Sequence, residues 1–405
     1  MTRFSPYQRR LFVLLSVANF FEGYDFLALS QILPNLRAEM GLSEAQGGTL
    51  VGVIGLGTIL AYGVVRLADR FGRRPVMMVT ILGYALFTGL TGVAPGVVAF
   101  AAFQVLARVF LIAEWALAMV FGAEEFPAER RGLAIGVLQA WSALGSIVCA
   151  GVVPLLLKTP YGWRSVYFVG LIPLLLLAYA RRGLKETERY TALAGGGAKQ
   201  ASSLFAIWGT PYRRRVIHLA LIWGLTYLCT ANAVVFWKEF AVGERGLTDA
   251  QVGLAIAIAS LISLPLVFLV GKLLDAWGRR PSAILIYVLL AVSVIAAYQL
   301  RGFWPLTVAL TGAIFAASAV LALLNSFTTE LFPTSMRGDA FAWSNNLLGR
   351  IGYVISPVFV GWAAGMVGWG TAVSMTTVGV VAALFLIMTV VPETAKKELE
   401  VTGGM

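Results

Sequence analysis

Five ionisable side chains stand inside long apolar stretches of this 405-residue chain. A charge held in hydrocarbon costs about 2.5 to 3.5 kcal/mol on insertion scales, and residues that bear it face the interior of a helix bundle. Acids at such positions can take up and release a proton, and arginines can attract an anion. The five candidate residues are Glu22, Asp25, Arg108, Glu114 and Arg350.

Asp25 and Arg108 are predicted to lie at similar depths in two different spans. Asp25 is about 12 Å, and Arg108 about 16 Å, from the same end of their helices at the usual rise per residue. A carboxylate beside an arginine stays ionised, and removal of the arginine favours its protonated form. We predict that Asp25 carries a proton and that Arg108 tunes it, with Glu22 as the substitute carrier. The alternative is a static pair that joins two helices.

Glu114 and Arg350 differ from that pair in position. Glu114 follows Arg108 by six residues, which turns it toward another face of the helix. It is open whether Glu114 is a gate, a second proton site or a structural tie to a cytoplasmic arginine. Arg350 is about 16 Å from the inner end of its span, and no acid in the second half of the chain has a matching depth. We predict that Arg350 binds the carboxylate of a substrate; a solvated arginine, or one bonded to backbone carbonyls, is the alternative.

Other polar and aromatic side chains inside the spans are able to complete a small-ligand site. Such sites combine apolar walls with a few amides and hydroxyls. Each of these residues can equally join two helices through a hydrogen bond. Besides Arg350, the predicted substrate-binding residues are Gln139, Trp141, Tyr227, Asn232, Asn345 and Asn346.

The elements that must position these residues are membrane-spanning helices. Hydrophobic residues make up 59% of the chain and charged residues 13%, which excludes an ordinary soluble domain. Twelve apolar runs are each long enough to cross about 30 Å of hydrocarbon. We therefore predict an all-α membrane protein of twelve transmembrane helices in two pseudo-symmetric six-helix bundles. The seventh, eleventh and twelfth spans are expected at 214–240, 339–363 and 371–391.

The predicted domains follow from the distribution of these runs. Residues 1–181 form the N-terminal half, 182–213 a cytoplasmic linker, 214–391 the C-terminal half and 392–405 a cytoplasmic tail. The net charge of +11 comes mostly from one side of the membrane, the side of both termini, which the positive-inside rule makes cytoplasmic. We predict a multi-pass protein of the cell (inner or plasma) membrane that binds no nucleic acid. The loops on the opposite side hold Arg37, Lys158, Arg164, Lys238, Arg245 and Arg301.

Two charged motifs each occur twice at one offset. The sequence DRFGRRP at 69–75 returns as DAWGRRP at 275–281, and EEFPAERRG at 124–132 returns as ELFPTSMRG at 330–338. In each case the copies are 206 residues apart, about half the chain, which indicates a duplication.

These repeated turns are predicted to form a cytoplasmic gate. Asp69 is expected to cap a neighbouring helix or to pair with Arg73 and Arg131, and Asp275 with Arg279 and Arg337. Such contacts would be made in one conformation and broken in another. The predicted gate residues are Asp69, Arg70, Arg73, Arg74, Arg131, Glu124, Asp275, Arg279, Arg280, Glu330 and Arg337.

The same motifs resemble those of the major facilitator superfamily. The turn at 69–75 and its echo at 275–281 are similar to the signature loop of that family, although Val65 stands where the second copy has the leading glycine, Gly271. The pair at 124–132 and 330–338, with Glu186-Thr187 and Pro392-Glu393-Thr394, resembles the branch of sugar porters, aromatic-acid symporters and organic-ion transporters. The resemblance implies a transporter that works by alternating access, whose proton-coupled members place an acid in span one and an arginine in span four.

We predict proton-coupled symport of a small organic carboxylate by a chain that is a monomer in the lipid bilayer. Its partners are the small-molecule substrate and protons. We expect no enzyme, no cofactor and no metal site, because the chain has one histidine and lacks hydrolase and metalloprotease motifs. The alternatives are a proton-coupled sugar or organic-cation transporter, a drug/proton antiporter, or a sensor built on the same fold.

Overall fold

The computed structural model describes residues 5 to 395, except 127, 188–190, 192–203 and 334–335. For 128–133, 172–173, 176 and 181 it describes the backbone alone. Every regular element in the described part of the chain is a helix, which confirms the all-α class. The chain divides into two compact units, one of residues 1–32 and 53–201 and the other of residues 33–52 and 202–405. The segment from 33 to 52 therefore packs with the second unit, although it comes early in the sequence.

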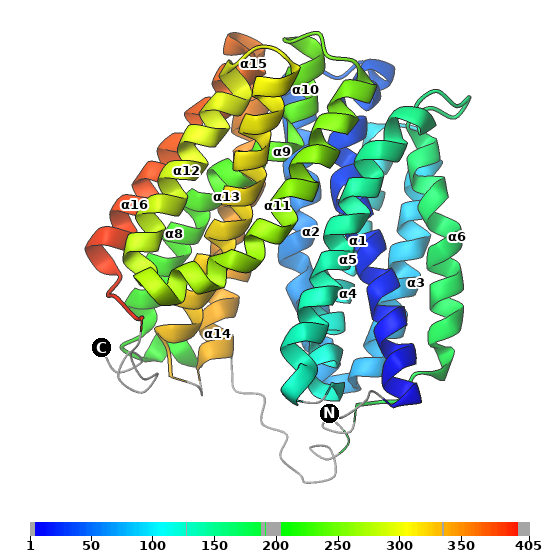
Figure 1. Ribbon diagram of the computed structural model, residues 1–405. Helices are drawn as coiled ribbons and strands as arrows, with labels where there is room; N and C mark the ends of the chain where they lie inside the picture. The colour runs from blue at the N-terminus through cyan, green and yellow to red at the C-terminus, as the bar shows by residue number, and fades with distance from the viewer. Residues whose placement is uncertain (1–4, 127, 188–190, 192–203, 334–335, 396–405) are drawn as a thin grey trace. The chain divides into compact units, whose positions relative to one another are not determined.

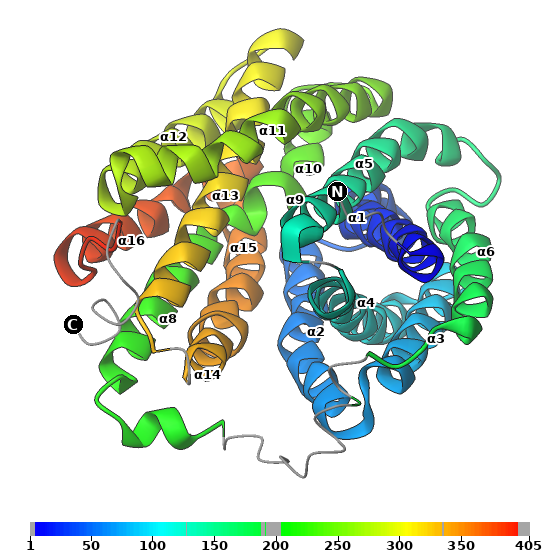
Figure 2. The same cartoon turned by 60° about the horizontal axis from the view of Figure 1, so that its bottom comes forward.

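The first unit is built from six long helices. Within it, α3 packs against α4 and α6 (Figures 1 and 2). Apolar side chains from the facing surfaces form a core that includes Met77, Ile81, Leu117, Phe121 and Leu174. The helices are α1 (Pro6–Met40), α2 (Glu44–Phe71), α3 (Arg73–Gly92), α4 (Val97–Glu125), α5 (Ala128–Leu156) and α6 (Arg164–Ala180), followed by the short turn η1 (Arg181–Gly183).

Helices α1 and α5 approach each other closely at two glycines of the first unit. A Cβ atom on Gly23 would lie 1.8 Å from the carbonyl oxygen of Ser142, and one on Gly145 would lie 1.8 Å from that of Phe20. Ser146 Oγ donates to the Gly23 carbonyl at 2.8 Å. Small residues allow membrane helices to come this close. The contact fixes the face of α1 on which Glu22 stands.

In the second unit, α13 packs against α11 and α12, and α8 packs against η3, α15 and α16 (Figure 2). The ends of α1 and α2 from residue 33 to residue 52 belong to this unit. Its other elements are η2 (Ala206–Gly209), α8 (Arg213–Thr230), α9 (Asn232–Val235), α10 (Trp237–Gly243), α11 (Asp249–Trp277), α12 (Arg279–Gln299), α13 (Phe303–Glu330), α14 (Arg337–Phe341), η3 (Ala342–Gly349), α15 (Arg350–Met375) and α16 (Thr377–Val390).

The seventh span is not the continuous helix that the sequence predicts at 214–240. It is interrupted at Ala231 and Phe236 and becomes α8, α9 and α10. The Tyr298 hydroxyl lies 3.2 Å from the carbonyl oxygens of both Asn232 and Ala233 and can donate to either. Backbone groups freed inside a membrane need such partners. No glycine or proline marks the interruption in the sequence, so apolar length alone could not reveal it.

The eleventh span also departs from the prediction. Its first part is divided into α14 and η3, and η3 is a π-helix of eight residues. Wide turns of this kind are rare and occur frequently at functional sites. Gly368, with φ 80° and ψ 160°, breaks the helical path inside α15. The break lies inside the connection between residues 363 and 371 that the predicted limits of the last two spans leave open, and its positive φ is one that glycine adopts readily.

Ten helical segments in the described part of the chain are long and apolar enough to cross a membrane. The last of them, Arg337–Val390, has 54 residues, and at about 1.5 Å per residue it covers two crossings. With α6, whose 17 residues are near the lower limit for one crossing, the described helices account for the twelve predicted spans.

Candidate functional site

Glu22 lies on the face of α1 that packs against α5. Ser142 Oγ donates a hydrogen bond to Glu22 Oε2 at 2.5 Å. The neighbouring Phe20 ring meets the ring of Trp141 edge to face, with 6.4 Å between centroids. The sequence marked Glu22 as an ionisable residue but did not predict that Ser142 would bind it.

Asp25, one turn further along α1, is 9% exposed. The hydroxyl of Tyr84, on α3, interacts with its carboxyl and also lies 3.2 Å from the carbonyl oxygen of Phe21, to which it donates. The side chain of Asp25 is therefore enclosed by helices of the first unit rather than turned toward lipid.

Arg108, on α4, is 7% exposed, and its Cζ lies 5.1 Å from the centre of the Phe26 ring. Its charge acts on both Asp25 and Glu22. Among the described residues, however, none holds Arg108 in an ion pair within 4.0 Å, and its Nη1 has no hydrogen-bond partner. The predicted residues thus come within electrostatic reach of one another without direct contact.

Three tyrosines of the first unit surround these charges and were missed by the sequence reasoning. They are Tyr24, Tyr84 and Tyr167. Tyr24 donates to the Val166 carbonyl at 3.2 Å. Tyr167 is 1% exposed, lies close enough to Asp25 and Arg108 to interact with both charges, and has a hydroxyl without a hydrogen-bond partner in the described part of the chain. Only the tertiary packing brings these hydroxyls toward Asp25.

Glu114 occupies a different part of the first unit. It is 3% exposed and accepts a hydrogen bond of 2.6 Å from Thr80 Oγ1, which comes from α3. This contact joins α3 to α4. The predicted part of Glu114 in proton coupling stays a prediction.

Arg350, in the second unit, lies between two aromatic rings. Its Cζ is 5.2 Å from the ring centre of Tyr227 and 5.4 Å from that of Tyr353. The two rings meet edge to face at 5.7 Å. Within the described part of the chain, no carboxylate forms an ion pair with Arg350, and its Nε is buried without a hydrogen-bond partner. The guanidinium is thus flanked by π-systems, an arrangement that suits a cation.

The π-helix η3 supplies the support for this arrangement. Its residue Asn345 accepts a hydrogen bond of 2.8 Å from the Tyr227 hydroxyl through Oδ1. Trp223 stacks on Tyr227 at 5.4 Å on the same face of α8, and its Nε1 donates to Thr328. Asn345 therefore contributes by orienting Tyr227, a ring beside Arg350. Tyr353 was not among the predicted site residues, because nothing in the sequence distinguishes it from other membrane tyrosines.

The remaining predicted substrate-binding residues are not gathered around Arg350. Asn232 is fully buried, and its amide nitrogen donates to Leu228 and to Ser356, so it joins α9 to α15. Gln139 and Trp141 belong to the first unit and are exposed. Asn346 is half-buried on η3, next to Asn345.

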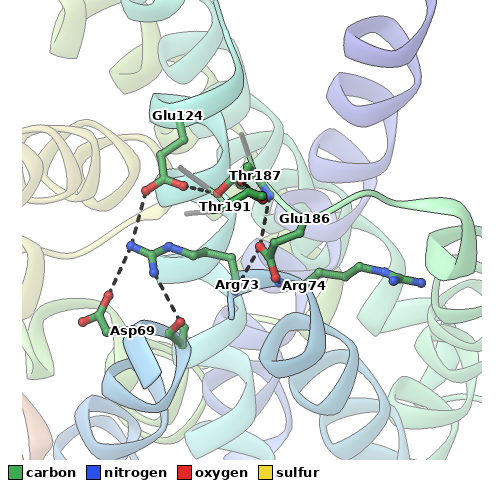
Figure 3. Close-up of polar contacts among 8 residues, drawn as sticks. Asp69, Arg73, Arg74, Glu124, Glu186, Thr187 and Thr191 are labelled. Atoms are coloured by element: carbon green, nitrogen blue, oxygen red, sulfur yellow. Dashed lines mark hydrogen bonds and ion pairs between the residues drawn. The ribbon is translucent and has the colours of Figure 1, made fainter. Parts of the chain in front are cut away.

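The first of the two repeated motifs forms a network inside the first unit, shown in Figure 3. Arg73 pairs with Asp69 at 3.2 Å and with Glu124 at 3.4 Å, and Thr187 donates to Glu124 at 2.6 Å. The backbone amides of Arg73 and Arg74 both donate to the carboxylate of Glu186. The helix ends of α2, α3 and α4 are thereby joined to the segment after α6.

The second copy repeats these contacts inside the second unit. Arg279 pairs with Asp275 at 3.0 Å and with Glu330 at 2.8 Å, and Thr394 donates to Glu330 at 2.5 Å. The amides of Arg279 and Arg280 donate to Glu393 at 2.9 and 2.8 Å. Burial raises the pKa of Glu393, but these donors, with the amides of Ala395 and Thr394, outweigh it and hold the pKa below the usual value.

A glycine makes each carboxylate cradle possible. Gly72 has φ +102° and Gly278 has φ +96°, in the region that side chains with a Cβ rarely adopt. A Cβ on Gly72 would lie 2.5 Å from Glu186 Oε2, and one on Gly278 would lie 3.1 Å from Glu393 Oε2. The glycine of each motif therefore both bends the chain and leaves room for the acid.

Several predicted gate residues have other contacts. The side chain of Arg131 lies outside the described part of the chain. Arg337 Nη2 reaches the Phe332 carbonyl at 3.5 Å, and Arg70 lies over the ring of Phe71 at 5.3 Å. The described contacts of both networks lie within single units, and the opening and closing of a gate stays a prediction. In the described residues no three His, Cys, Asp or Glu side chains gather to hold a metal ion.

The profile of the Major Facilitator Superfamily matches residues 15–242 and 219–404, nearly the whole chain. The chain belongs to the Major Facilitator Superfamily. Members of this superfamily are membrane transporters of small molecules, so the protein is a multi-span transporter and not an enzyme.

Individual members of the superfamily resemble the chain along its length. A sialic acid transporter of Escherichia coli (strain K12) is 24% identical over 95% of this chain and 94% of its own. A probable 4-methylmuconolactone transporter of Cupriavidus pinatubonensis (strain JMP 134 / LMG 1197) is 29% identical over 98% and 94%. The crystal structure of a D-xylose-proton symporter superposes with a TM-score of 0.75 at 19% identity, over 96% of this chain and 99% of the symporter, and shows the shared fold.

Proposed function

We propose that this superfamily member carries a small organic carboxylate together with a proton, by alternating access. One observation carries the substrate class. Arg350 is a partly buried cation between two tyrosine rings, and none of the described residues supplies a carboxylate to pair with it. An anion that enters this site would find an unpaired guanidinium, the group best suited to hold a carboxylate through two parallel hydrogen bonds.

The surroundings of Arg350 favour a carboxylate over a sugar or an amine. Sugar sites need several free amides, but Asn345 Oδ1 is occupied by Tyr227 and the Asn232 nitrogen by Leu228 and Ser356. An organic cation needs an acidic side chain as its partner, whereas Arg350 is positively charged and would repel it. The names of the relatives agree with this choice, since sialic acid is an organic acid and 4-methylmuconolactone is a small organic metabolite.

The buried acids of the first unit support the proton coupling. Asp25 is enclosed, faces the Tyr84 hydroxyl, and lies within reach of the charge of Arg108. Because Arg108 forms no ion pair with a described acid, it can favour either acid without holding one permanently. We assign the proton to Asp25 and keep Glu22, bonded to Ser142, as the substitute carrier. By the positive-inside rule both termini are cytoplasmic.

The substrate class is tested with purified protein and a panel of benzoate, gluconate, xylose and a quaternary amine. We expect thermal stabilisation by benzoate and its loss in Arg350→Gln. Arg301→Gln, a change at an exposed loop, is the matched control and should bind as the parent does. Stabilisation by xylose or the amine, or benzoate binding that survives Arg350→Gln, would contradict the proposal.

The proton is tested in proteoliposomes with an imposed pH gradient. Asp25→Asn should abolish concentrative uptake and spare exchange of solute between the two sides, because exchange needs no net proton movement. Glu22→Gln should retain uptake. If concentrative uptake is unchanged in Asp25→Asn, Asp25 is not the carrier.

A further inference from the structure

The segment Leu33–Gly52, here called the hairpin, is held to the rest of the second unit by charges that the sites above do not use. It comprises the end of α1 and the start of α2. Arg37 Nη1 pairs with Glu239 Oε2, on α10, at 2.7 Å. Arg37 Nη2 pairs with Glu44, inside the hairpin, at 2.9 Å, and the guanidinium lies 5.6 Å from the centre of the Trp369 ring.

Glu239 is the acid on which this contact depends. It is 6% exposed, and its second oxygen, Oε1, is buried without a hydrogen-bond partner in the described part of the chain. A carboxylate usually satisfies both oxygens when it is buried. One carboxylate oxygen of Glu239 therefore pairs with Arg37, and the other is a buried acceptor to which none of the described residues donates.

The other charges around Glu239 come from each element packed against it. Lys238, beside it on α10, is 1% exposed, pairs with Asp249 at 2.7 Å and donates to Asn35 Oδ1 at 3.3 Å. Asp249 is the first residue of α11, so the Lys238–Asp249 ion pair joins α10 to α11 and includes no residue of the hairpin. The charged groups that act on Glu239 are Arg37 from α1, Glu44 from α2 and Lys238 from α10.

The hairpin also packs tightly against α15. A Cβ atom on Gly48 would lie 2.6 Å from Gly361 Cα, and one on Gly52 would lie 2.7 Å from the Val354 carbonyl oxygen. Both helices of the hairpin continue into the first unit. The hairpin is thus packed within the second unit against α10 and α15.

We propose that Glu239 is a proton-binding site and that its protonation undocks the hairpin. A proton added to Oε1 converts the carboxylate to a neutral acid and removes the charge that holds Arg37. Arg37 then keeps its ion pair with Glu44, which belongs to the hairpin too. Arg37 is therefore still paired when the hairpin separates from α10. Glu239 in turn is left neutral, so neither partner is stranded as an isolated buried charge. The Lys238–Asp249 pair is untouched by this step.

The docking is measured by the distance between spin labels at positions 38 and 301, with no solute present. Ala38 is exposed at the hairpin, and Arg301 is exposed next to Leu300, whose carbonyl accepts from Arg245 just beyond α10. The labelled protein carries Ala38→Cys and Arg301→Cys, with the buried Cys149 and Cys229 replaced by alanine. Lowering the pH from about 7.5 to about 5.5 favours the protonated form of a carboxyl and should lengthen the distance. We expect the ratio of long to short distances to rise at least about tenfold.

Three variants decide the assignment. Glu239→Gln should show the long distance at both pH values, and Asp249→Asn, the matched control, should respond as the parent does. Arg37→Gln removes the same ion pair from the other side, so it gives the same answer if Glu239→Gln does not fold. A parent without a pH response, or Glu239→Gln or Arg37→Gln that keeps the short distance at neutral pH, would overturn the proposal.

The experiments can distinguish a failure of the proposal that Asp25 carries the proton from a failure of the proposal that Glu239 binds one. The distance measurement needs no transport, so it can succeed when no carboxylate is carried. If uptake persists in Asp25→Asn while the distance still responds to pH through Glu239, the proposed carrier is wrong and the hairpin site stands.

Discussion

The guanidinium of Arg350 lies 5.2 Å from the ring centre of Tyr227, and a hydrogen bond from the Tyr227 hydroxyl to Asn345 fixes that ring. The geometry of the cation is therefore set by a residue on α8 and by one on the π-helix, not by an ion pair. The Tyr227 ring contacts Arg350, whereas its hydroxyl contacts Asn345. Substitutions can therefore measure the effect of the ring on carboxylate binding separately from that of the hydroxyl.

Tyr227→Phe keeps the ring and loses the bond to Asn345, whereas Tyr227→Ala loses both. A cation–π contact contributes about 0.5 to 2 kcal/mol, so Tyr227→Ala should weaken carboxylate binding by about 2- to 30-fold, and Tyr227→Phe should weaken it less. Isothermal titration with benzoate measures both. Tyr161→Ala, at a tyrosine 66% exposed, should bind as the parent does. Equal losses in the two Tyr227 variants would assign the effect to the hydroxyl alone.

Gly145→Ala should destabilise the protein much more than Gly151→Ala on the same helix. A Cβ on Gly145 would lie 1.8 Å from the Phe20 carbonyl oxygen, whereas one on Gly151 has nothing within 4 Å. Overpacking costs about 1 to 3 kcal/mol, and a clash with backbone cannot be relieved by a side-chain rotation. Thermal unfolding in detergent compares the two. Similar melting temperatures would show that α1 and α5 are not packed this closely.

Arg73 and Arg279 occupy equivalent positions in the two copies of the motif. Replacing either by alanine should lower the melting temperature, and Arg279→Ala should lower it more than Arg73→Ala. Arg279 approaches Glu330 at 2.8 Å, while Arg73 approaches Glu124 at 3.4 Å. Charge-assisted hydrogen bonds contribute about 1.5 to 3 kcal/mol. Because the two networks share no residue, the losses in the double variant should add. Melting temperatures of the two single variants and the double variant test this. A double variant no worse than Arg279→Ala would mean that the networks are coupled.

Glu393 should make stability fall in acid. Burial acts to raise its pKa, but the backbone amides of Ala395, Arg280, Arg279 and Thr394 together hold the pKa below the unfolded value. Its stabilising contribution is therefore present above the unfolded pKa of about 4.3 and disappears as the pH falls through the lower folded pKa. Melting curves of the parent and Glu393→Gln should differ at neutral pH and converge in strong acid. A gap that stays constant across this range would contradict the sign.

One ion pair in each network could be predicted from the sequence, because its two residues are close together along the chain. Asp69 with Arg73, and Asp275 with Arg279, are one helical turn apart, a spacing at which side chains meet whatever the rest of the fold does. The hydrogen bonds from the backbone amides after Gly278 to Glu393 were not predicted, because they join segments separated by more than a hundred residues. The resemblance marked Glu393 and Thr394 without saying what they bind.

The candidate sites were less accessible to prediction. In a membrane chain the lipid-facing and core-facing surfaces are both apolar, so periodicity does not reveal which way a residue points. Asp25 and Arg350 could be found because an ion in an apolar span is costly, while Tyr84, Tyr167 and Tyr353 carry no such cost and could not. Asn232 has the composition of a binding residue, yet the interruption after α8 places it in the contact with Ser356.

The twin carboxylate cradles at Gly72 and Gly278 have a consequence for how such a molecule works. Each six-helix half ties down its own loops with its own acids and arginines. Because each cradle and its described donors belong to one unit, these charges are matched without a contact from the other unit. The duplicated turn thus stabilises the loop ends of each unit through residues of that unit alone.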